Sequence, residues 1–275
     1  MSAAAETAPG SPVPGSPVPG ALEAHLRARR AAGAKLLVPY VTGGLGDDWV
    51  EVVQAVAAAG ADAIEVGIPF SDPVMDGPVI QEASVRALRA RTTPRRVLQG
   101  IAAAEIGIPV AVMTYYNLVA RAGDRRMAAE LHAAGVAAAI LPDLPLEEAG
   151  PWCAEADAAG VETVLLAAPT TDGPRLARIV ARSRGFLYAV GLLGVTGERE
   201  HVARSALEIA RRAKAATDLP VLVGVGVSTP AQAEEICRVA DGVVVGSALV
   251  RRLLAGEGPE GAGRFVAEMR RALDA

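Results

Sequence analysis

The sequence has few of the side chains that build metal centres and covalent active sites. Its 275 residues include two cysteines, three histidines and, among 27 basic residues, only two lysines, Lys35 and Lys214. Cys153 and Cys237 are too few for a disulfide framework or a cysteine-based metal cage. Aromatic residues make up 3% of the chain. These scarcities exclude several reaction classes once the fold is taken into account.

Charge and hydropathy exclude two classes of partner. The formal net charge of -4 lacks the positive field that binding to a nucleic acid or an anionic membrane requires. No uninterrupted apolar run approaches the length of a membrane span, and the N-terminus lacks the basic-then-apolar order of a signal peptide. We therefore expect a cytoplasmic protein that binds neither nucleic acid nor membrane. The length and the 51% hydrophobic content suffice for one large core.

The chain begins with a proline-rich segment. Residues 10–19 repeat the sequence Gly-Ser-Pro-Val-Pro, which neither forms helical hydrogen-bond ladders nor packs a core. Residues 1–20 are predicted to be a disordered or polyproline-like tail, and residues 21–275 a single catalytic domain.

From Lys35 onward, short apolar runs alternate with longer amphipathic stretches of helical spacing. The eight runs are Lys35–Val41, Ala63–Gly67, Val110–Thr114, Ala138–Leu141, Thr163–Ala167, Phe186–Val190, Val221–Val225 and Val243–Val245. Continuous apolar runs are typical of parallel strands covered on both faces. Eight units in about 240 residues favour a closed (β/α)8 TIM barrel over an open doubly wound sheet.

Two segments exceed the minimal barrel unit. An amphipathic helix at Leu22–Ala32 precedes the first strand and is predicted to plug the N-terminal end of the barrel. Two helical stretches, Val79–Ala90 and Pro94–Glu105, lie between the second and third strands.

Active sites of such barrels lie at the carboxyl ends of the strands, and no lysine, histidine or cysteine falls there. Lys35 begins the first strand and Lys214 lies in a helix, which argues against a Schiff-base enzyme. The histidines fall on helices or a lid loop, so we expect no metal site. Proton transfer by carboxylates remains.

Two carboxylates are the candidate catalytic residues. Glu65 stands alone in an apolar strand, where partial desolvation should raise its pKa toward that of a general acid. Asp76 follows in a stiff, proline-flanked loop that can return over the barrel mouth. Each has a structural alternative, since Glu65 can bond the backbone and Asp-Gly is a common turn pair.

Glycines after the last two strands point to a phosphate. Gly224–Ser228 and Val245–Ala248 place bare amides and a hydroxyl where barrels of this type commonly bind one. A third glycine-rich segment, Gly194–Gly197, is predicted to be a loop that closes over the substrate.

Several motifs together resemble the α subunit of tryptophan synthase. They are Ile64–Gly67, Pro69–Pro78, Leu141–Pro145, Gly194–Gly197 and Val245–Ala248. The resemblance runs from about residue 35 to 255, and the Pro-Phe-Ser-Asp-Pro segment is highly specific. It implies cofactor-independent retro-aldol cleavage of indole-3-glycerol phosphate into indole and glyceraldehyde 3-phosphate.

The resemblance also implies residue roles. Glu65 corresponds to the family's acid/base carboxylate, and Asp76 to the carboxylate that binds the indole N–H. Tyr188 corresponds to a pocket tyrosine, and Thr196 to a lid residue that bonds the aspartate on closure. Tyr40, Tyr115 and Leu141 are candidates for the apolar slot around the indole. The phosphate would be held by Gly197, Val225, Gly226, Gly246 and Ser247.

The resemblance further implies an α2β2 complex, in which a β subunit carries pyridoxal phosphate and receives indole through a tunnel. Pro69 and Asp72 resemble the family's contacts to that subunit. The sequence departs from the family pattern at Gly43–Asp47, at Gly191–Leu193 and at Val225, all in the mouth or lid.

Because of these departures, other functions stay open. One is a free-standing indole-3-glycerol phosphate lyase that releases indole for another pathway. Another is a catalytically silent partner that only activates a β-type subunit, although a pure scaffold has no need of Glu65 and Asp76. A barrel enzyme acting on a different sugar phosphate is the fourth.

Overall fold

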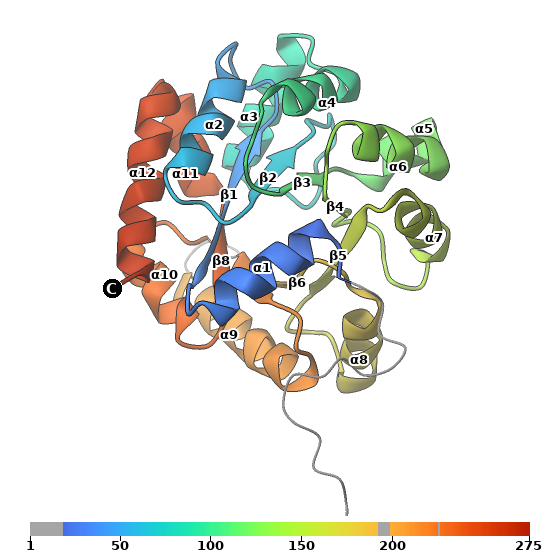
Figure 1. Ribbon diagram of the computed structural model, residues 1–275, viewed down its shortest axis with the longest axis vertical. Helices are drawn as coiled ribbons and strands as arrows, with labels where there is room; N and C mark the ends of the chain where they lie inside the picture. Colours follow the sequence, from blue (N-terminus) through green and yellow to red (C-terminus); the bar gives the residue numbers. More distant parts are fainter. Residues whose placement is uncertain (1–18, 192–198, 225) are drawn as a thin grey trace, which may run out of the picture.

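Eight parallel strands close into a barrel in the computed structural model, which describes residues 19–191, 199–224 and 226–275. The strands are β1 (Leu36–Thr42), β2 (Ile64–Gly67), β3 (Val110–Met113), β4 (Ala138–Ile140), β5 (Glu162–Ala167), β6 (Leu187–Val190), β7 (Val221–Gly224) and β8 (Gly242–Val245). Every observed boundary lies within one residue of its predicted position. The predicted (β/α)8 TIM barrel is therefore confirmed, and helices surround it on the outside (Figure 1).

Twelve helices lie in the described part of the chain. They are α1 (Ala21–Ala31), α2 (Trp49–Ala58), α3 (Pro78–Arg89), α4 (Pro94–Ala103), α5 (Tyr116–Ala122), α6 (Asp124–Ala133), α7 (Gly150–Ala159), α8 (Gly173–Arg182), α9 (Arg199–Ala216), α10 (Pro230–Cys237), α11 (Ser247–Leu254) and α12 (Gly258–Leu273). The predicted pair between β2 and β3 is present as α3 and α4.

Two further helix pairs were not predicted: α5 with α6 after β3, and α11 with α12 after β8. Gly123 separates the first pair with φ 88°, and Gly256, with φ 85°, lies between α11 and α12, whose first residue Gly258 has φ 58°. Glycine adopts these left-handed angles without the steric cost that a Cβ brings. These glycines therefore lie where one helix of each pair ends and the next begins.

The strands alternate inward and outward side chains, which creates two separate cores. Outward residues pack beneath the helices in one large cluster that includes Leu37, Val41 and Val66. Inward residues such as Leu36, Val38 and Phe186 fill the barrel interior. At the β1–β8 seam, a Cβ at Gly242 would collide with the backbone of Leu36. Glycine at this position therefore allows the last strand to close against the first.

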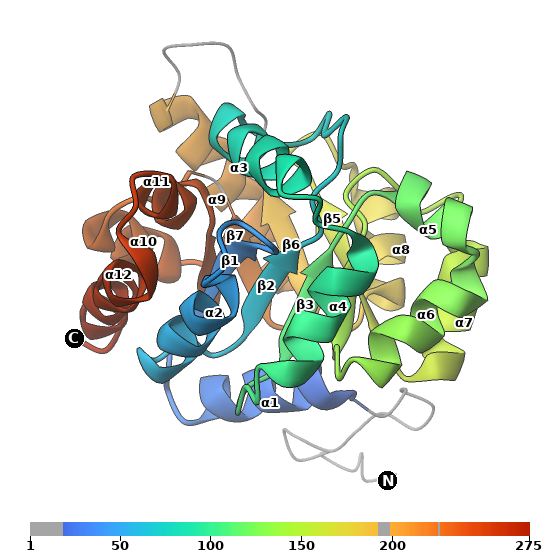
Figure 2. The same ribbon diagram turned by 90° about the horizontal axis from the view of Figure 1, so that it is seen from above.

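Helix α1 seals the N-terminal end of the barrel, as predicted. Its Leu22 and Leu26 are fully buried among the inward-facing strand residues. The carboxylate of Glu162 accepts hydrogen bonds from the Leu22 and Glu23 amides (2.7 and 3.1 Å), which caps the start of the helix. The side chain of Arg29 donates to buried Asp62 at 2.6 Å. Figure 2 shows α1 at one end of the barrel, which leaves the opposite end for the site.

The predicted tail lies outside the described residues as far as position 18. Pro19 and Gly20 are described, and a Cβ at Gly20 would overlap the Glu162 side chain. No helix in the described ranges has both the length and the apolarity to cross a membrane.

Candidate active site

Glu65 lies at the carboxyl-terminal end of the barrel interior. Its strand pairs with β1 so that Glu65 is in register with Tyr40, and with β3 so that it is in register with Ala111. Parallel strands in register direct these side chains to the same face, which here is the barrel interior. The side chain is 1% exposed, and its Oε2 has no hydrogen-bond partner in the described part of the chain.

The environment of Glu65 favours its protonated form. Burial disfavours the charged carboxylate, and the negative charge of Asp76 adds to this effect. Together they raise the pKa of Glu65 from 4.5 to about 8, against the opposing influence of the Tyr188 hydroxyl. The carboxyl group is therefore protonated at neutral pH, and its free oxygen can bind a ligand.

Asp76 reaches this space from the loop between β2 and α3. The hydroxyl of Tyr115 donates a hydrogen bond to Asp76 Oδ2 at 3.1 Å. The Gln81 side chain donates to the Asp76 carbonyl at 2.9 Å, which holds the loop against the start of α3. Partial burial raises the pKa of Asp76, while the Tyr115 hydrogen bond lowers it. The two carboxylates are thus close enough for the charge of Asp76 to influence Glu65.

Two glycines make room for the tyrosines beside Glu65. A Cβ at Gly67 would overlap the hydroxyl end of Tyr40, and a Cβ at Gly224 would overlap the ring of Tyr188. Tyr40 is 6% exposed, and its hydroxyl accepts a bond from Thr42 at 3.4 Å. Gly224, which the sequence grouped with the phosphate-binding glycines, gives Tyr188 space inside the barrel.

The apolar residues near the mouth differ in part from the predicted ones. Leu141 packs in the cluster between strands and helices, while its neighbour Ile140 faces the interior. Residues missed by the sequence reasoning include Ile80 and Met113, which pack with Tyr40. Met113 was detectable from the alternation of β3, because it lies two residues after the inward Ala111.

Tyr115 also departs from its predicted place in an apolar slot. The residue is buried, but its hydroxyl makes polar contacts with the Asp76 loop: it accepts from the Met75 amide at 3.0 Å and donates to Asp76. Its ring stacks on Phe70 with centroids 5.1 Å apart. These contacts hold Tyr115 against the loop between β2 and α3.

The predicted phosphate residues are described only in part. Gly246 and Ser247 form the start of α11, whose amino end favours an anion. Gly226 has φ +55° and open space around its Cα, and it precedes α10, which begins with a capping box from Thr229 and Gln232. Gly197 and Val225 lie outside the described residues, as does the predicted lid residue Thr196.

Both lysines lie away from the mouth. Lys35 directly precedes β1, and Lys214 in α9 pairs with Asp241 at 2.7 Å, just before β8 begins. In the described ranges, no group of three or more His, Cys, Asp or Glu side chains is arranged to hold a metal ion. Around Glu65, the titratable side chains described by the structure are the carboxyl of Asp76 and the phenols of Tyr40 and Tyr188.

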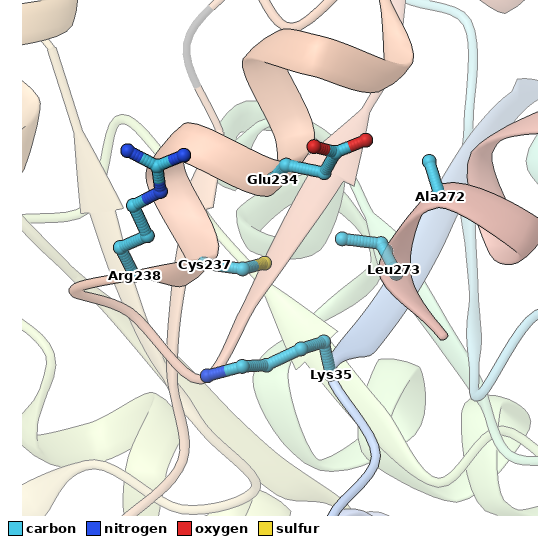
Figure 3. A pocket seen from close by; sticks show the side chains of 6 residues that line it. All are labelled: Lys35, Glu234, Cys237, Arg238, Ala272 and Leu273. Carbon is cyan, nitrogen blue, oxygen red and sulfur yellow. The ribbon is translucent and has the colours of Figure 1, made fainter. Parts of the chain in front are cut away.

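A surface hollow of about 240 Å³ lies outside this site, where Lys35, α10 and α12 meet (Figure 3). Cys237 is one of the residues that line it, and burial raises the pKa of that thiol to about 11. The thiol is therefore protonated and a poor nucleophile at neutral pH.

Comparison with known proteins shows which family the chain belongs to. The family model for the tryptophan synthase alpha chain matches residues 26–272. A tryptophan synthase alpha chain from Thermobifida fusca is 46% identical over 239 residues, which cover 85% of this chain and 88% of that protein. One from Halorhodospira halophila is 44% identical over 257 residues, covering 90% and 94%.

Solved structures show the same likeness. A chain from the structure of Mycobacterium tuberculosis tryptophan synthase superposes with a TM-score of 0.87 at 39% identity, covering 94% of this chain and all of that one. Tryptophan synthase subunit alpha from Legionella pneumophila gives 0.82 at 32% identity, covering 94% and 99%. With a matching sequence model, close relatives and a shared barrel, this chain belongs to the tryptophan synthase alpha chain family of lyases.

Proposed function

We propose that this chain cleaves indole-3-glycerol phosphate to indole and glyceraldehyde 3-phosphate, with Glu65 and Asp76 as its catalytic residues. The observation that carries the assignment is the buried carboxyl of Glu65. Burial and the nearby charge of Asp76 raise its pKa to about 8, and its Oε2 has no hydrogen-bond partner among the described residues. A carboxyl in this state can donate a proton near neutral pH.

The proposed chemistry needs one proton donor and one fixed negative charge. Protonated Glu65 delivers its proton to the indole C3 carbon, which places positive charge on the ring. Asp76 accepts a hydrogen bond from the indole N–H and stabilises that charge. The bond between C3 and the glycerol carbon then breaks, its electrons stay on the indole, and the proton of the glycerol hydroxyl passes to Glu65. The products are indole and the aldehyde, and Glu65 is protonated again.

The remaining predicted residues receive proposed roles from their positions. Tyr40 and Tyr188 bound the indole space, and Gly246 and Ser247 hold the phosphate with Gly226. Gly197, Val225 and Thr196 keep the roles that the family resemblance implies. The chain's two lysines lie away from Glu65, which supports a reaction without a Schiff base to lysine. That the reaction needs no cofactor in this chain is part of the proposal.

A β-subunit partner is part of the proposal. Val74 is 79% exposed and Met75 46% exposed, and both lie on the loop that carries Asp76. Two adjacent exposed apolar side chains are available for contact with a partner, and we propose that the β subunit covers them. We propose an α2β2 assembly in which pyridoxal phosphate belongs to the β subunit. A cytoplasmic location remains a prediction from the sequence.

Indole release separates this proposal from its alternatives. The purified chain is incubated with indole-3-glycerol phosphate, with and without a tryptophan synthase β subunit, and indole is measured. We expect slow release by the chain alone and faster release with the partner. Fast release that the partner leaves unchanged would indicate a free-standing lyase. No release in either case would indicate a scaffold, or an enzyme of another sugar phosphate if binding of indolepropanol phosphate is also absent.

The pH dependence of kcat/KM should report the Glu65 pKa. Because the acid must be protonated to act, we expect kcat/KM to fall as pH rises through about 8. The measurement is a series of initial rates between pH 6 and 9.5, with circular dichroism at each pH to confirm that the protein is folded. A rate that stays constant over this range would argue against Glu65 as the proton donor.

A further inference from the structure

Tyr115 joins two polar groups of the loop that carries Asp76. Its hydroxyl accepts a hydrogen bond from the Met75 amide at 3.0 Å and donates one to Asp76 Oδ2 at 3.1 Å. A phenol oxygen that both accepts and donates has a defined orientation, because its one proton is committed to the carboxylate. The neighbouring backbone and the carboxylate are therefore fixed to the same atom.

The ring of Tyr115 is fixed as well. It is 3% exposed and stacks on Phe70 at the start of the same loop, with an interplanar angle of 28°. Tyr115 thus contacts the loop at both ends, through its ring near β2 and through its hydroxyl near α3. Such a side chain restricts how far the loop can swing away from the mouth.

A second contact holds the backbone of Tyr115. The amide of the next residue, Tyr116, donates to both carboxylate oxygens of Asp143, at 2.9 and 3.1 Å. Asp143 lies in the loop after β4, and Tyr115 directly precedes α5. The loops after β2, β3 and β4 are therefore linked by one chain of contacts from Asp143 through Tyr115 to Asp76.

We infer that Tyr115 is a positioning residue that holds Asp76 over the mouth, with Oδ2 occupied by the phenol and Oδ1 directed to the substrate. The inference rests on the proposed function of Asp76. It replaces the expectation that Tyr115 lines an apolar slot. A carboxylate held in place before the substrate arrives stabilises developing charge without a reorganisation step.

Other groups near Asp76 bear on its titration. Glu65 from β2, Tyr40 from β1 and Tyr188 from β6 each have a pKa raised in part by the charge of Asp76. The two phenols stay neutral near pH 7, so Glu65 is the neighbour that titrates in this range. The Tyr115 hydrogen bond lowers the pKa of Asp76, and its removal should raise that pKa.

The test is Tyr115→Phe, which keeps the ring and removes the hydroxyl. We expect kcat/KM for lyase turnover to fall about 10- to 100-fold, the range for a lost hydrogen bond to a charged group. We also expect the acidic limb of the pH profile to move to higher pH. Tyr116→Phe is the matched control, because it removes a hydroxyl one residue along whose hydrogen bond in the described ranges is a long one, to Asp124 at 3.5 Å. Its kcat/KM should stay within about twofold of wild type.

A double-mutant cycle separates positioning from general damage to the fold. In an Asp76→Asn background, Tyr115→Phe should cost less than about threefold, because the carboxylate it positions is already absent. An undiminished loss in that background would show that Tyr115 acts elsewhere and would overturn the inference. If Tyr115→Phe unfolds, Phe70→Leu loosens the same ring, and a wild-type pH profile in that variant would also count against it.

A carboxyl titration makes the inference testable apart from catalysis. Carbon-13 NMR of Asp76 should show a higher pKa in Tyr115→Phe than in wild type. An unshifted Asp76 together with wild-type kcat/KM would refute the positioning role while leaving the lyase intact. A wild-type chain that binds but never cleaves indole-3-glycerol phosphate would instead refute the proposed function, and the titration would still decide the role of Tyr115.

Discussion

Glu65→Gln should lower kcat for cleavage of indole-3-glycerol phosphate by about 10²- to 10⁴-fold, the usual contribution of a general acid. Glutamine matches the shape of the buried side chain but has no acidic proton to give to the indole C3 carbon. The measurement is indole release under saturating substrate, together with binding of the uncleaved analogue indolepropanol phosphate. Analogue binding should change little, because the phosphate contacts lie on other strands.

Glu162→Gln is the matched control. Glu162 is also a buried glutamate with a raised pKa, but it caps α1 at the opposite end of the barrel. We expect this variant to lose stability and keep its lyase rate. Near-wild-type turnover by Glu65→Gln would refute the assignment of Glu65.

Glu65→Gln should lower activity but raise stability at alkaline pH. Folding raises the pKa of Glu65 from 4.5 to about 8, so the folded state binds its proton more tightly than the unfolded state does. The wild-type chain therefore loses stability as pH rises between these values, and Glu65→Gln does not. Urea unfolding at pH 5 and pH 8 should show that the variant's advantage in unfolding free energy is larger at pH 8.

Asp76→Asn should lower kcat on the order of 10²- to 10³-fold, because a neutral amide cannot stabilise the positive charge on the protonated indole. The lost charge also acts on Glu65, whose pKa is raised in part by Asp76. We therefore expect the residual activity to fall off at a lower pH than in wild type. Rates and pH profiles of the isolated chain test both effects.

Asp72→Asn provides the control on the same loop. Asp72 is exposed. In the described part of the chain, its side chain accepts a hydrogen bond from the hydroxyl of the neighbouring Ser71. In the isolated chain its lyase rate should stay within about twofold of wild type. If both aspartate variants lost activity equally, the loop as a whole, and not the Asp76 charge, would be responsible.

Together these variants test the separate roles proposed for three residues at the barrel mouth. In the proposed mechanism Glu65 supplies the proton and Asp76 supplies the charge, and the further inference is that Tyr115 fixes where that charge lies. Loss of the proton donor is expected to cost most, and loss of the positioning hydroxyl least. A different order of effects would require the roles to be reassigned.

The sequence alone determined the strands and the chemical groups available for catalysis. Apolar runs located all eight strands to within one residue, because strand formation depends on local side-chain pattern and burial. The scarcity of lysine and histidine at strand ends left Glu65 and Asp76 as candidates. The helix breaks at Gly123 and Gly256 were not predicted. Glycine adopts both positive and negative φ angles, so its presence alone does not specify a break.

Only the tertiary structure decided which neighbours these side chains have. Adjacent residues of a strand face opposite sides. Whether Leu141 or Ile140 faces the barrel interior therefore depended on a shift of one residue, and the structure places Ile140 there. Gly224 in β7 makes room for Tyr188 in the neighbouring strand β6, a relation set by the register of these two strands. The hydroxyl of Tyr115 donates a hydrogen bond to Asp76, which lies 39 residues away in the sequence. Hydrogen bonds depend on ångström-scale distances between loops, which local sequence patterns do not specify.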